Sequence, residues 1–285
     1  MTRAAKKWQH SMLLRIRQLS LYLLFAVLAI VIFFPFYWII VTSLKQQTDI
    51  YSADMHLIPS HITLDNYRYA LSESDVLRFS VNSLIVGGAS MILTVVLSMM
   101  AVYPLVRMDF SGKRLFYGLM ASTQVFPLVV TILPLYMFFR HFNLYNTFTS
   151  LVLLYTATGL PVCIVLLMGH FLDVPRELED AAFIDGCSRM RCLVQIVMPV
   201  VTPAIVSTGI YVFLSNWQEY LAASSLIADR NKFTLTLGLT LFRTQHSTNW
   251  GALMATAVLL AVPAIVLFFI IEDYFIDSLA GSVKE

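Results

Sequence analysis

The residues of this sequence that could do chemistry form two polar sets, one in a loop and one inside apolar stretches. The loop stretch, Glu177 to Pro203, reads ELEDAAFIDGCSRMRCLVQIVMPVVTP, and its first fifteen residues hold four carboxylates and two arginines. Neither set has the spacing of a metal site or of a nucleophile with its base. Binding, rather than catalysis, is therefore the chemistry to expect. The second set is Asn82, Gln124, Asn216, Gln218 and Glu219.

The loop stretch begins and ends like a short helix. Asp173 precedes Pro175 by two residues, which predicts an N-cap followed by a proline in the first turn, where its missing amide donor is not needed. The carboxylates that follow favour the positive end of a helix. Gly186 is placed to end the helix in a left-handed conformation. A second short helix is expected at about 188–197.

One side of the first loop helix is expected to be small and nearly flat. Leu178, Ala181, Ala182 and Asp185 lie at i, i+3, i+4 and i+7. Such a face suits a groove on a partner protein. A plain connector between two membrane helices is an equally open interpretation of the same residues.

The elements that must position these residues are membrane helices. Hydrophobic residues make up 58% of the chain and charged residues 13%, which is too apolar for an ordinary soluble domain. Several intervals without Asp, Glu, Lys or Arg are at least as long as the roughly 20 residues that cross a hydrocarbon core. They are apolar all round, unlike amphipathic soluble helices, and do not alternate as barrel strands do. The predicted spans are 19–44, 79–106, 115–139, 150–172, 201–224 and 250–276.

The chain is therefore expected to be all-α, a polytopic membrane protein with six transmembrane helices and one helical cytoplasmic loop. We expect a cytoplasmic segment at 1–18, a six-span domain at 19–276 with its loop at 173–200, and a cytoplasmic tail at 277–285. Twelve basic residues fall on the side of the N-terminus and seven on the other side. The positive-inside rule thus predicts that both termini and the loop face the cytoplasm.

The polar residues inside the predicted spans are candidates for a translocation pathway. A carboxylate in a membrane helix is costly unless it faces a partner or an aqueous cavity. Asn216 and Glu219 are predicted on one face of the fifth span, with aromatic neighbours of the kind that hold hydroxyl-rich ligands. Hydrogen bonding between helices is the alternative. It is the better interpretation for Asn82 and Gln124, and for Glu219 both stay open.

The loop stretch resembles the conserved cytoplasmic loop of ABC-importer permeases, whose pattern is E-A-A, then D-G, then I-x-L-P nine residues later. Asp180-Ala181-Ala182 stand in the E-A-A place, Asp185-Gly186 follow after two residues, and Ile196-Val197-Met198-Pro199 come nine residues on. Aspartate replaces the usual glutamate and Met198 the usual leucine, which keeps the charge and the apolar bulk. The resemblance implies a contact with an ATPase for Glu179, Asp180, Ala181, Ala182, Asp185, Gly186, Ile196 and Pro199.

Further stretches resemble the carbohydrate branch of that family, the second permease of maltose-type systems. They are FFPFYWIIVTSLK, LDNYRYAL, FSVNSLIVG, NLYNTFTSLVLLY, NWQEYL and the C-terminal AGSVKE. The resemblance implies a bacterial inner-membrane permease that works with a second homologous permease, two cytoplasmic ATPase subunits and an extracytoplasmic solute-binding protein. The implied substrate is a carbohydrate of oligosaccharide, polyol or uronate type.

The sequence lacks the motifs that bind ATP, so ATP binding and hydrolysis are expected on other subunits. The sequence holds no G-x-x-x-x-G-K-[ST] phosphate loop, so ATP and Mg are expected on partners, and this chain is expected to be non-catalytic, without cofactor, metal or nucleic acid. Cys163, Cys187 and Cys192 are expected as free thiols. An ion-coupled secondary transporter or channel is the main alternative. Such proteins place ionisable residues at mid-membrane, where the predicted spans have almost none. A membrane scaffold is a third interpretation, but it would not require the loop motif.

Overall fold

The computed structural model describes residues 3–52, 56–243 and 247–282. Within these ranges the chain is helical and forms no strand beyond one isolated bridge between Arg243 and Thr248. The predicted all-α class is confirmed. The long helices are α1 (Arg3–Ser43), α4 (Val76–Arg107), α7 (Phe148–Asp173), α10 (Met198–Trp217) and α13 (Trp250–Ser282).

Shorter helices join the long ones. The described residues include two π-helical turns, η1 (Tyr69–Glu73) and η2 (Leu193–Val197), and two 3-10 turns, η3 (Arg230–Lys232) and η4 (Leu239–Phe242). The short α-helices are α2 (Gln47–Ile50), α3 (Asp65–Arg68), α5 (Lys113–Val125), α6 (Leu128–His141), α8 (Arg176–Ile184), α9 (Arg189–Cys192), α11 (Leu221–Leu226) and α12 (Leu235–Gly238).

The described residues contain five helices that are long and apolar enough to cross a membrane, or six if α5 and α6 together make one broken span. The predicted third span, 115–139, is this pair, bent by 102°. Its break falls at Phe126 and Pro127, both with extended backbone. Proline lacks the amide donor that would continue the helix, and it disfavours helical backbone in the residue before it.

The fifth span is shifted toward the N-terminus relative to the predicted 201–224. A membrane-length helical segment runs from Arg189 to Trp217 through α9, η2 and α10. The predicted second loop helix at 188–197 is therefore the beginning of this span. Pro199 does not end the helix, because it lies in the first turn of α10, where a missing amide is tolerated. The predicted spans 79–106, 150–172 and 250–276 lie within α4, α7 and α13, and the predicted span 19–44 extends one residue beyond the end of α1.

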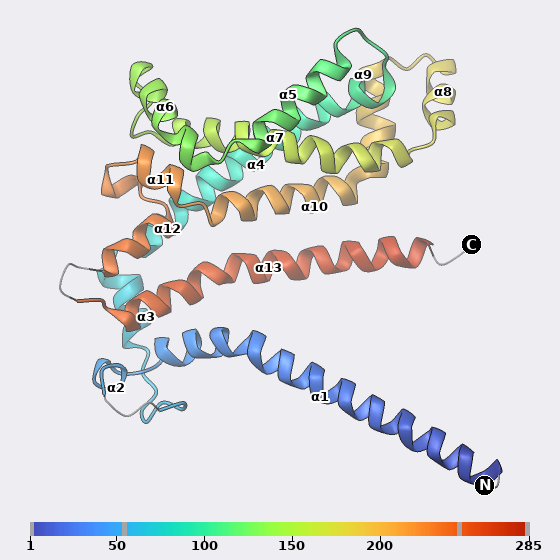
Figure 1. Cartoon of the computed structure of the whole chain (residues 1–285). Coiled ribbons are helices and arrows are strands. Elements are labelled where there is room, and N and C mark those ends of the chain that lie inside the picture. The colour runs from blue at the N-terminus through green and yellow to red at the C-terminus, as the bar shows by residue number, and fades with distance from the viewer. Residues whose placement is uncertain (1–2, 53–55, 244–246, 283–285) are drawn as a thin grey trace.

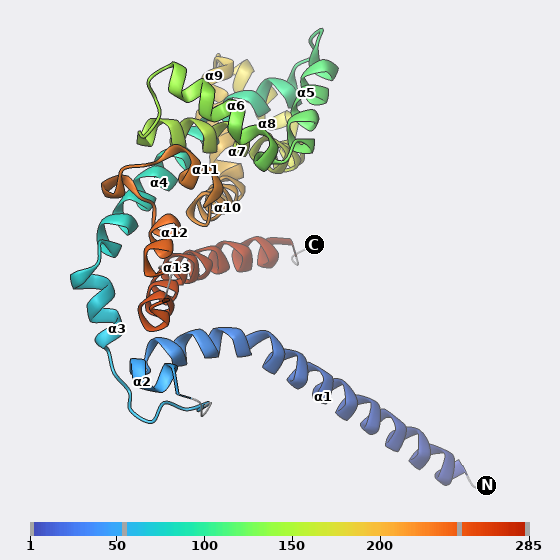
Figure 2. The same cartoon turned by 60° about the vertical axis from the view of Figure 1, so that its left-hand side comes forward.

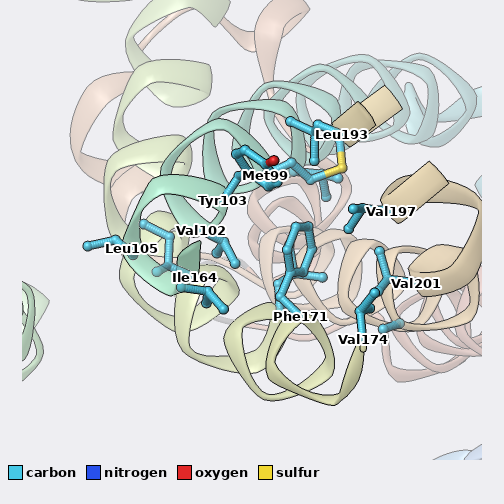
Figure 3. Close-up of a cluster of buried hydrophobic side chains, with 14 of the residues drawn as sticks. Met99, Val102, Tyr103, Leu105, Ile164, Phe171, Val174, Leu193, Val197 and Val201 are labelled. Atoms are coloured by element: carbon cyan, nitrogen blue, oxygen red, sulfur yellow. The ribbon is translucent and has the colours of Figure 1, made fainter. Parts of the chain in front are cut away.

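The packed core lies where α4, α7 and the beginning of the fifth span meet. Figure 3 shows Val102 of α4 and Val197 of η2 beside Phe171 of α7, which is fully buried. The same cluster includes Ala182 of α8 and Cys192 of α9. The core therefore continues without a gap into the polar loop.

Two helices stand largely apart from this core. Helix α1 packs against α13 (Figures 1 and 2), and few of the described side chains of these two helices are buried. Figure 1 shows that α1 begins, and α13 ends, at the end of the molecule where α8 lies. Helices α2, α3 and α12 lie at the opposite end. This arrangement suits an even number of membrane crossings.

Candidate functional site

The loop between α7 and α9 is a short helix held between an extended entry and a left-handed exit. The predicted N-cap at Asp173 is wrong: Asp173 is the last residue of α7, and Pro175 takes the N-cap position of α8 without a side-chain cap. The chain needs two extended residues, Val174 and Pro175, to turn out of α7. The predicted left-handed glycine is confirmed, because Gly186 has a φ of +84°.

Glu179 ties α8 to the end of α4. Its Oε1 accepts a hydrogen bond from Arg107 Nε at 2.5 Å, and its Oε2 accepts one from the Tyr103 hydroxyl at 3.0 Å. Arg107 Nη2 also donates to the carbonyl oxygen of Val174 at 2.7 Å. The side chains of Arg107 and Glu179 are only 7% and 5% exposed. A buried, hydrogen-bonded ion pair thus fixes the loop helix to the core.

The predicted flat face of α8 is divided between two environments. Ala182 is buried against the core, as is Glu179, one turn away on the same side. Leu178, Ala181 and Asp185 are exposed instead. Periodicity placed Ala182 with the wrong neighbours, because the inward side of α8 is set by its contact with Arg107.

The outer side of the loop carries an apolar tip. We use this name for Leu178, Phe183, Ile184 and Met190, all exposed, with Ile184 87% exposed. Apolar groups exposed together beside a rigidly held helix are a feature of protein contact surfaces. Of the other motif residues, Asp180, Asp185, Gly186 and Pro199 are exposed, and Ile196 packs against the core.

Asn82 and Asn216 make contacts between elements. The Asn82 amide donates to the carbonyl oxygens of Asn231 and Phe233, both at 2.9 Å, and so ties α4 to the loop at the end opposite the termini. The Asn216 amide donates to the Ser90 hydroxyl at 2.9 Å and links α10 to α4. A role of either residue in a pathway stays a prediction.

Glu219 lies in the short non-helical segment between α10 and α11. The prediction that it shares a helix face with Asn216 is therefore wrong. Helix α10 ends at Trp217 and α11 begins at Leu221. The Glu219 carboxylate accepts from the amides of Ala222 and Ala223, at 2.7 and 3.2 Å, and from the Tyr155 hydroxyl at 2.7 Å. It therefore caps α11 and joins it to α7.

Gln124 and Gln218 are both exposed. Gln218 is the residue after α10. Gln124 lies near the end of α5 and lines a cavity of about 710 Å³ between the α5–α6 bend and α7. Three threonines line the same cavity, and Gln124 also lines a second cavity of about 460 Å³. The bend thus gives this amide an open, mainly apolar surrounding. The threonines are Thr123, Thr131 and Thr158.

The structure also brings in a residue that the sequence reasoning did not choose. No role was predicted for Arg107, yet it holds the loop in place. Its position directly after the predicted second span could have indicated that it lies near the cytoplasmic loop. Among the described residues, no group of three or more His, Cys, Asp or Glu side chains could hold a metal. The three cysteines are free.

Residues 94–280 match a family model described as binding-protein-dependent transport system inner membrane component. The sulfoquinovosyl glycerol transport system permease of Agrobacterium fabrum is 35% identical to this chain over 252 residues, which are 88% of each protein. The diacetylchitobiose uptake system permease DasC of Streptomyces coelicolor is 32% identical and covers 90% of this chain and 94% of its own length.

Two further similarities extend over most of the chain. The trehalose/maltose transport system permease of Thermococcus litoralis is 30% identical over 262 residues, 90% of this chain and 93% of its own. A chain in the crystal structure of a bacterial ABC transporter involved in the import of the acidic polysaccharide alginate matches with a TM-score of 0.81. The match covers 92% of this chain and 97% of the other, and at 18% identity it is a likeness of fold.

Proposed function

The chain belongs to the family of binding-protein-dependent transport system inner membrane components, and from this membership we propose that it imports a carbohydrate as one permease of an ATP-driven transporter. The relatives described above are named for a sulfoquinovosyl glycerol, a chitobiose derivative and trehalose or maltose. Their names support a substrate of the oligosaccharide, polyol or uronate type.

The proposed transporter contains four further subunits besides this chain. A second homologous permease completes the pathway, two cytoplasmic ATPase subunits hold ATP and Mg, and an extracytoplasmic binding protein delivers the solute. We assign no catalytic step to this chain. The proposed location is the bacterial inner membrane with both termini in the cytoplasm. The basic residues on the side of the termini support that orientation.

The observation that carries the coupling role is the joint between α8 and α4. In the proposed mechanism, a cleft on an ATPase subunit holds the apolar tip. When the ATPases close, the force on α8 reaches α4 through Glu179 and Arg107, and it reaches α7 and α10 through the chain itself. Since α4, α7 and α10 pack along one another, a movement of the tip shifts the pathway helices together.

Reconstitution tests the proposal. The permease pair and its ATPases are placed in vesicles with ATP inside and the loaded binding protein outside, and uptake of a labelled saccharide is measured. We expect uptake that requires both ATP and the binding protein. Uptake that follows an ion gradient without ATP would identify a secondary transporter instead.

The variant Ile184→Asp isolates the coupling role within this assay. A carboxylate at the most exposed position of the apolar tip opposes burial in a cleft, while the buried pair is untouched. We expect ATPase subunits to dissociate from Ile184→Asp permease on purification. Glu177→Ala, an exposed change on the same helix, is the control and should assemble normally. Equal ATPase recovery with both variants would place the contact elsewhere.

A further inference from the structure

A small pocket lies at the end of the molecule opposite the termini, between the end of α1, α2 and the beginning of α13. Its volume is about 290 Å³, and its walls include Trp38, Thr42 and Lys45 from the first helix and its end, and Trp250 from α13. It is separate from the buried pair at the loop and from the cavities at the α5–α6 bend.

Lys45 places a buried cation at this pocket. The side chain belongs to a residue only 4% exposed, and it forms no ion pair with any described residue. Its ammonium donates to the carbonyl oxygen of His56 at 2.6 Å and lies 4.6 Å from the centre of the Trp38 ring. An ammonium has three donors, and a buried charge is costly unless it is paired.

Thr42 is a second polar group of the pocket whose hydrogen bonding is incomplete. The residue is 7% exposed, and its hydroxyl finds no partner among the described residues. A helical threonine usually bonds to a carbonyl of the preceding turn, and this one does not. One donor and one cation therefore remain for a bound group with acceptor oxygens. A phosphate offers several acceptor oxygens and a negative charge at once.

The position of the pocket indicates where such a phosphate comes from. Tryptophans gather at the level of lipid headgroups, and Trp38 and Trp250 both line the pocket at the end of a membrane helix. Exposed apolar side chains continue from it along both helices. They include Tyr37 and Ile40 on α1 and Val262 and Ile265 on α13. Acyl chains attached to a headgroup in the pocket have apolar surface to follow.

We propose that this pocket binds one phospholipid headgroup through its phosphate, held by the Lys45 ammonium and the Thr42 hydroxyl. The site is independent of the transported solute and of the ATPase contact. Asp49 of α2 is not part of the pocket wall, but it precedes Ile50 of that wall, and one of its carboxylate oxygens is buried without a partner among the described residues. An ethanolamine headgroup carries an ammonium beyond its phosphate for that carboxylate, so phosphatidylethanolamine is the probe.

Native mass spectrometry of the assembled, delipidated transporter measures the binding as phosphatidylethanolamine is added. We expect one tightly bound lipid for each copy of this permease. Thr42→Val keeps the shape of the side chain and breaks no bond within the described protein, and it should weaken binding about 5-fold, as loss of one hydrogen bond does. Lys45→Met should weaken binding at least about 10-fold, since it removes a charge-assisted bond.

Controls separate this proposal from its rivals. Arg68→Gln removes an exposed cation of α3, at the same end of the molecule, and should bind lipid like the unchanged protein. Soluble glycerophosphoethanolamine should compete only weakly, because it lacks the acyl chains; binding as tight as the lipid's would make the site one for free phosphate esters. Equal lipid binding by all variants would overturn the proposal. So would an Lys45→Met permease that loses its partner permease while the unchanged protein carries no lipid, since Lys45 would then pair with the partner.

Discussion

Glu179 and Glu219 are both carboxylates among packed helices, yet they are satisfied in different ways. Glu179 meets a guanidinium and a phenol, so that its charge is matched. Glu219 meets two backbone amides and a phenol, so that its oxygens are bonded while its charge has no ion-pair partner among the described residues. The first arrangement resists separation of two elements, and the second fixes the beginning of α11.

The bonding of Glu219 predicts a loss of stability on truncation. Glu219→Ala leaves two amides and the Tyr155 hydroxyl without their acceptor, and it should lower the free energy of unfolding by about 1–3 kcal/mol. Glu219→Gln keeps one acceptor oxygen and should lower it less. Thermal unfolding of the assembled complex measures both, with Tyr155→Phe as the variant that removes only one donor. The capping role would be contradicted if the three variants had the same melting temperature as the unchanged protein.

Uptake tests whether Glu219 also belongs to the pathway. We expect Glu219→Gln to import less solute per assembled complex, because an amide oxygen is a weaker hydrogen-bond acceptor for sugar hydroxyls than a carboxylate. The measurement is uptake in reconstituted vesicles, normalised to the complex. Unchanged uptake with Glu219→Gln would remove this residue from the pathway and leave it a helix cap.

Gly186 predicts a defect in coupling without one in insertion. Gly186→Ala forces a side chain into left-handed backbone, at a cost of about 1–2 kcal/mol, and should reorient the apolar tip. The stimulation of ATP hydrolysis by loaded binding protein should fall, while the amount of permease in the membrane stays the same. Gly169→Ala is the matched control, because Gly169 lies within α7 with open space around it. Equal stimulation in both variants would show that the turn is not needed.

The sequence predicted the left-handed conformation of Gly186 but did not predict that the Glu179 side chain points into the core. Both outcomes have the same reason. A left-handed glycine is a local requirement, readable from its neighbours. The inward side of a nine-residue helix is set by Arg107, which lies 72 positions earlier in the chain. No local pattern in the loop could have paired them.

At the scale of elements, α8 depends on its neighbours. A helix of nine residues is marginal on its own, so its order comes from the buried pair and from the core contact of Ala182. The apolar tip therefore keeps one orientation only while the buried pair and the Ala182 contact hold α8 in place.

A double-mutant cycle measures the interaction energy between Arg107 and Glu179, which connect α4 and α8. Arg107→Met and Glu179→Met each leave one buried charge unpaired and should each destabilise the complex by about 3–5 kcal/mol. The double variant should recover a large part of that loss, because no lone charge remains. Lys113→Gln, in the exposed pair with Asp109, is the control and should change stability very little. Simple addition of the two single losses would mean that the residues do not act as a pair.

The double variant also separates stability from coupling. It should fold yet transmit force poorly, because a strong directional bond has been replaced by apolar contact. Its ATP hydrolysis should respond less to loaded binding protein than that of the unchanged complex. A normal response would show that the covalent connections of α8 are enough.

The α5–α6 bend is the element that hydropathy described least well. The apolar interval predicted one span, but hydropathy does not specify the angle of a bend within it. The two helices have 13 and 14 residues, so each is about 20 Å long, which is too short for a core of about 30 Å. The break, and the cavity beside Gln124, follow from Pro127 together with the surface of α7.

At the scale of the whole molecule, the positions of the chain ends give a topology prediction. Cysteine at Ser111 should react with an impermeant thiol reagent only from the cytoplasmic side, and cysteine at Ala228 only from the other side, since both positions are exposed. Cys187 is replaced by serine, while Cys163 and Cys192 are buried and can stay. Labelling of both positions from one side would contradict the predicted orientation.

The sequence predicted the number of apolar segments well and their packing poorly. Lipid tails are as apolar as the side chains they meet, so burial leaves no amphipathic pattern in a membrane helix. That is why nothing in the sequence separated α1 and α13 from α4, α7 and α10. Their separation depends on surfaces that only the folded chain brings together.

The 72 positions between Arg107 and Glu179 also impose an order on biosynthesis. At about 5–20 residues per second, the ribosome releases α4 roughly 4–14 s before it delivers the carboxylate that neutralises Arg107. Throughout that interval the guanidinium has to remain at the membrane surface in contact with water. Only after α5, α6 and α7 have inserted can α8 arrive and cover it. Nascent chains stalled before Glu179 should therefore be cut by trypsin at Arg107, and chains stalled well beyond α10 should be protected there. The contact that joins two helices in the finished permease would thus mark the moment when the helices made between them are in place.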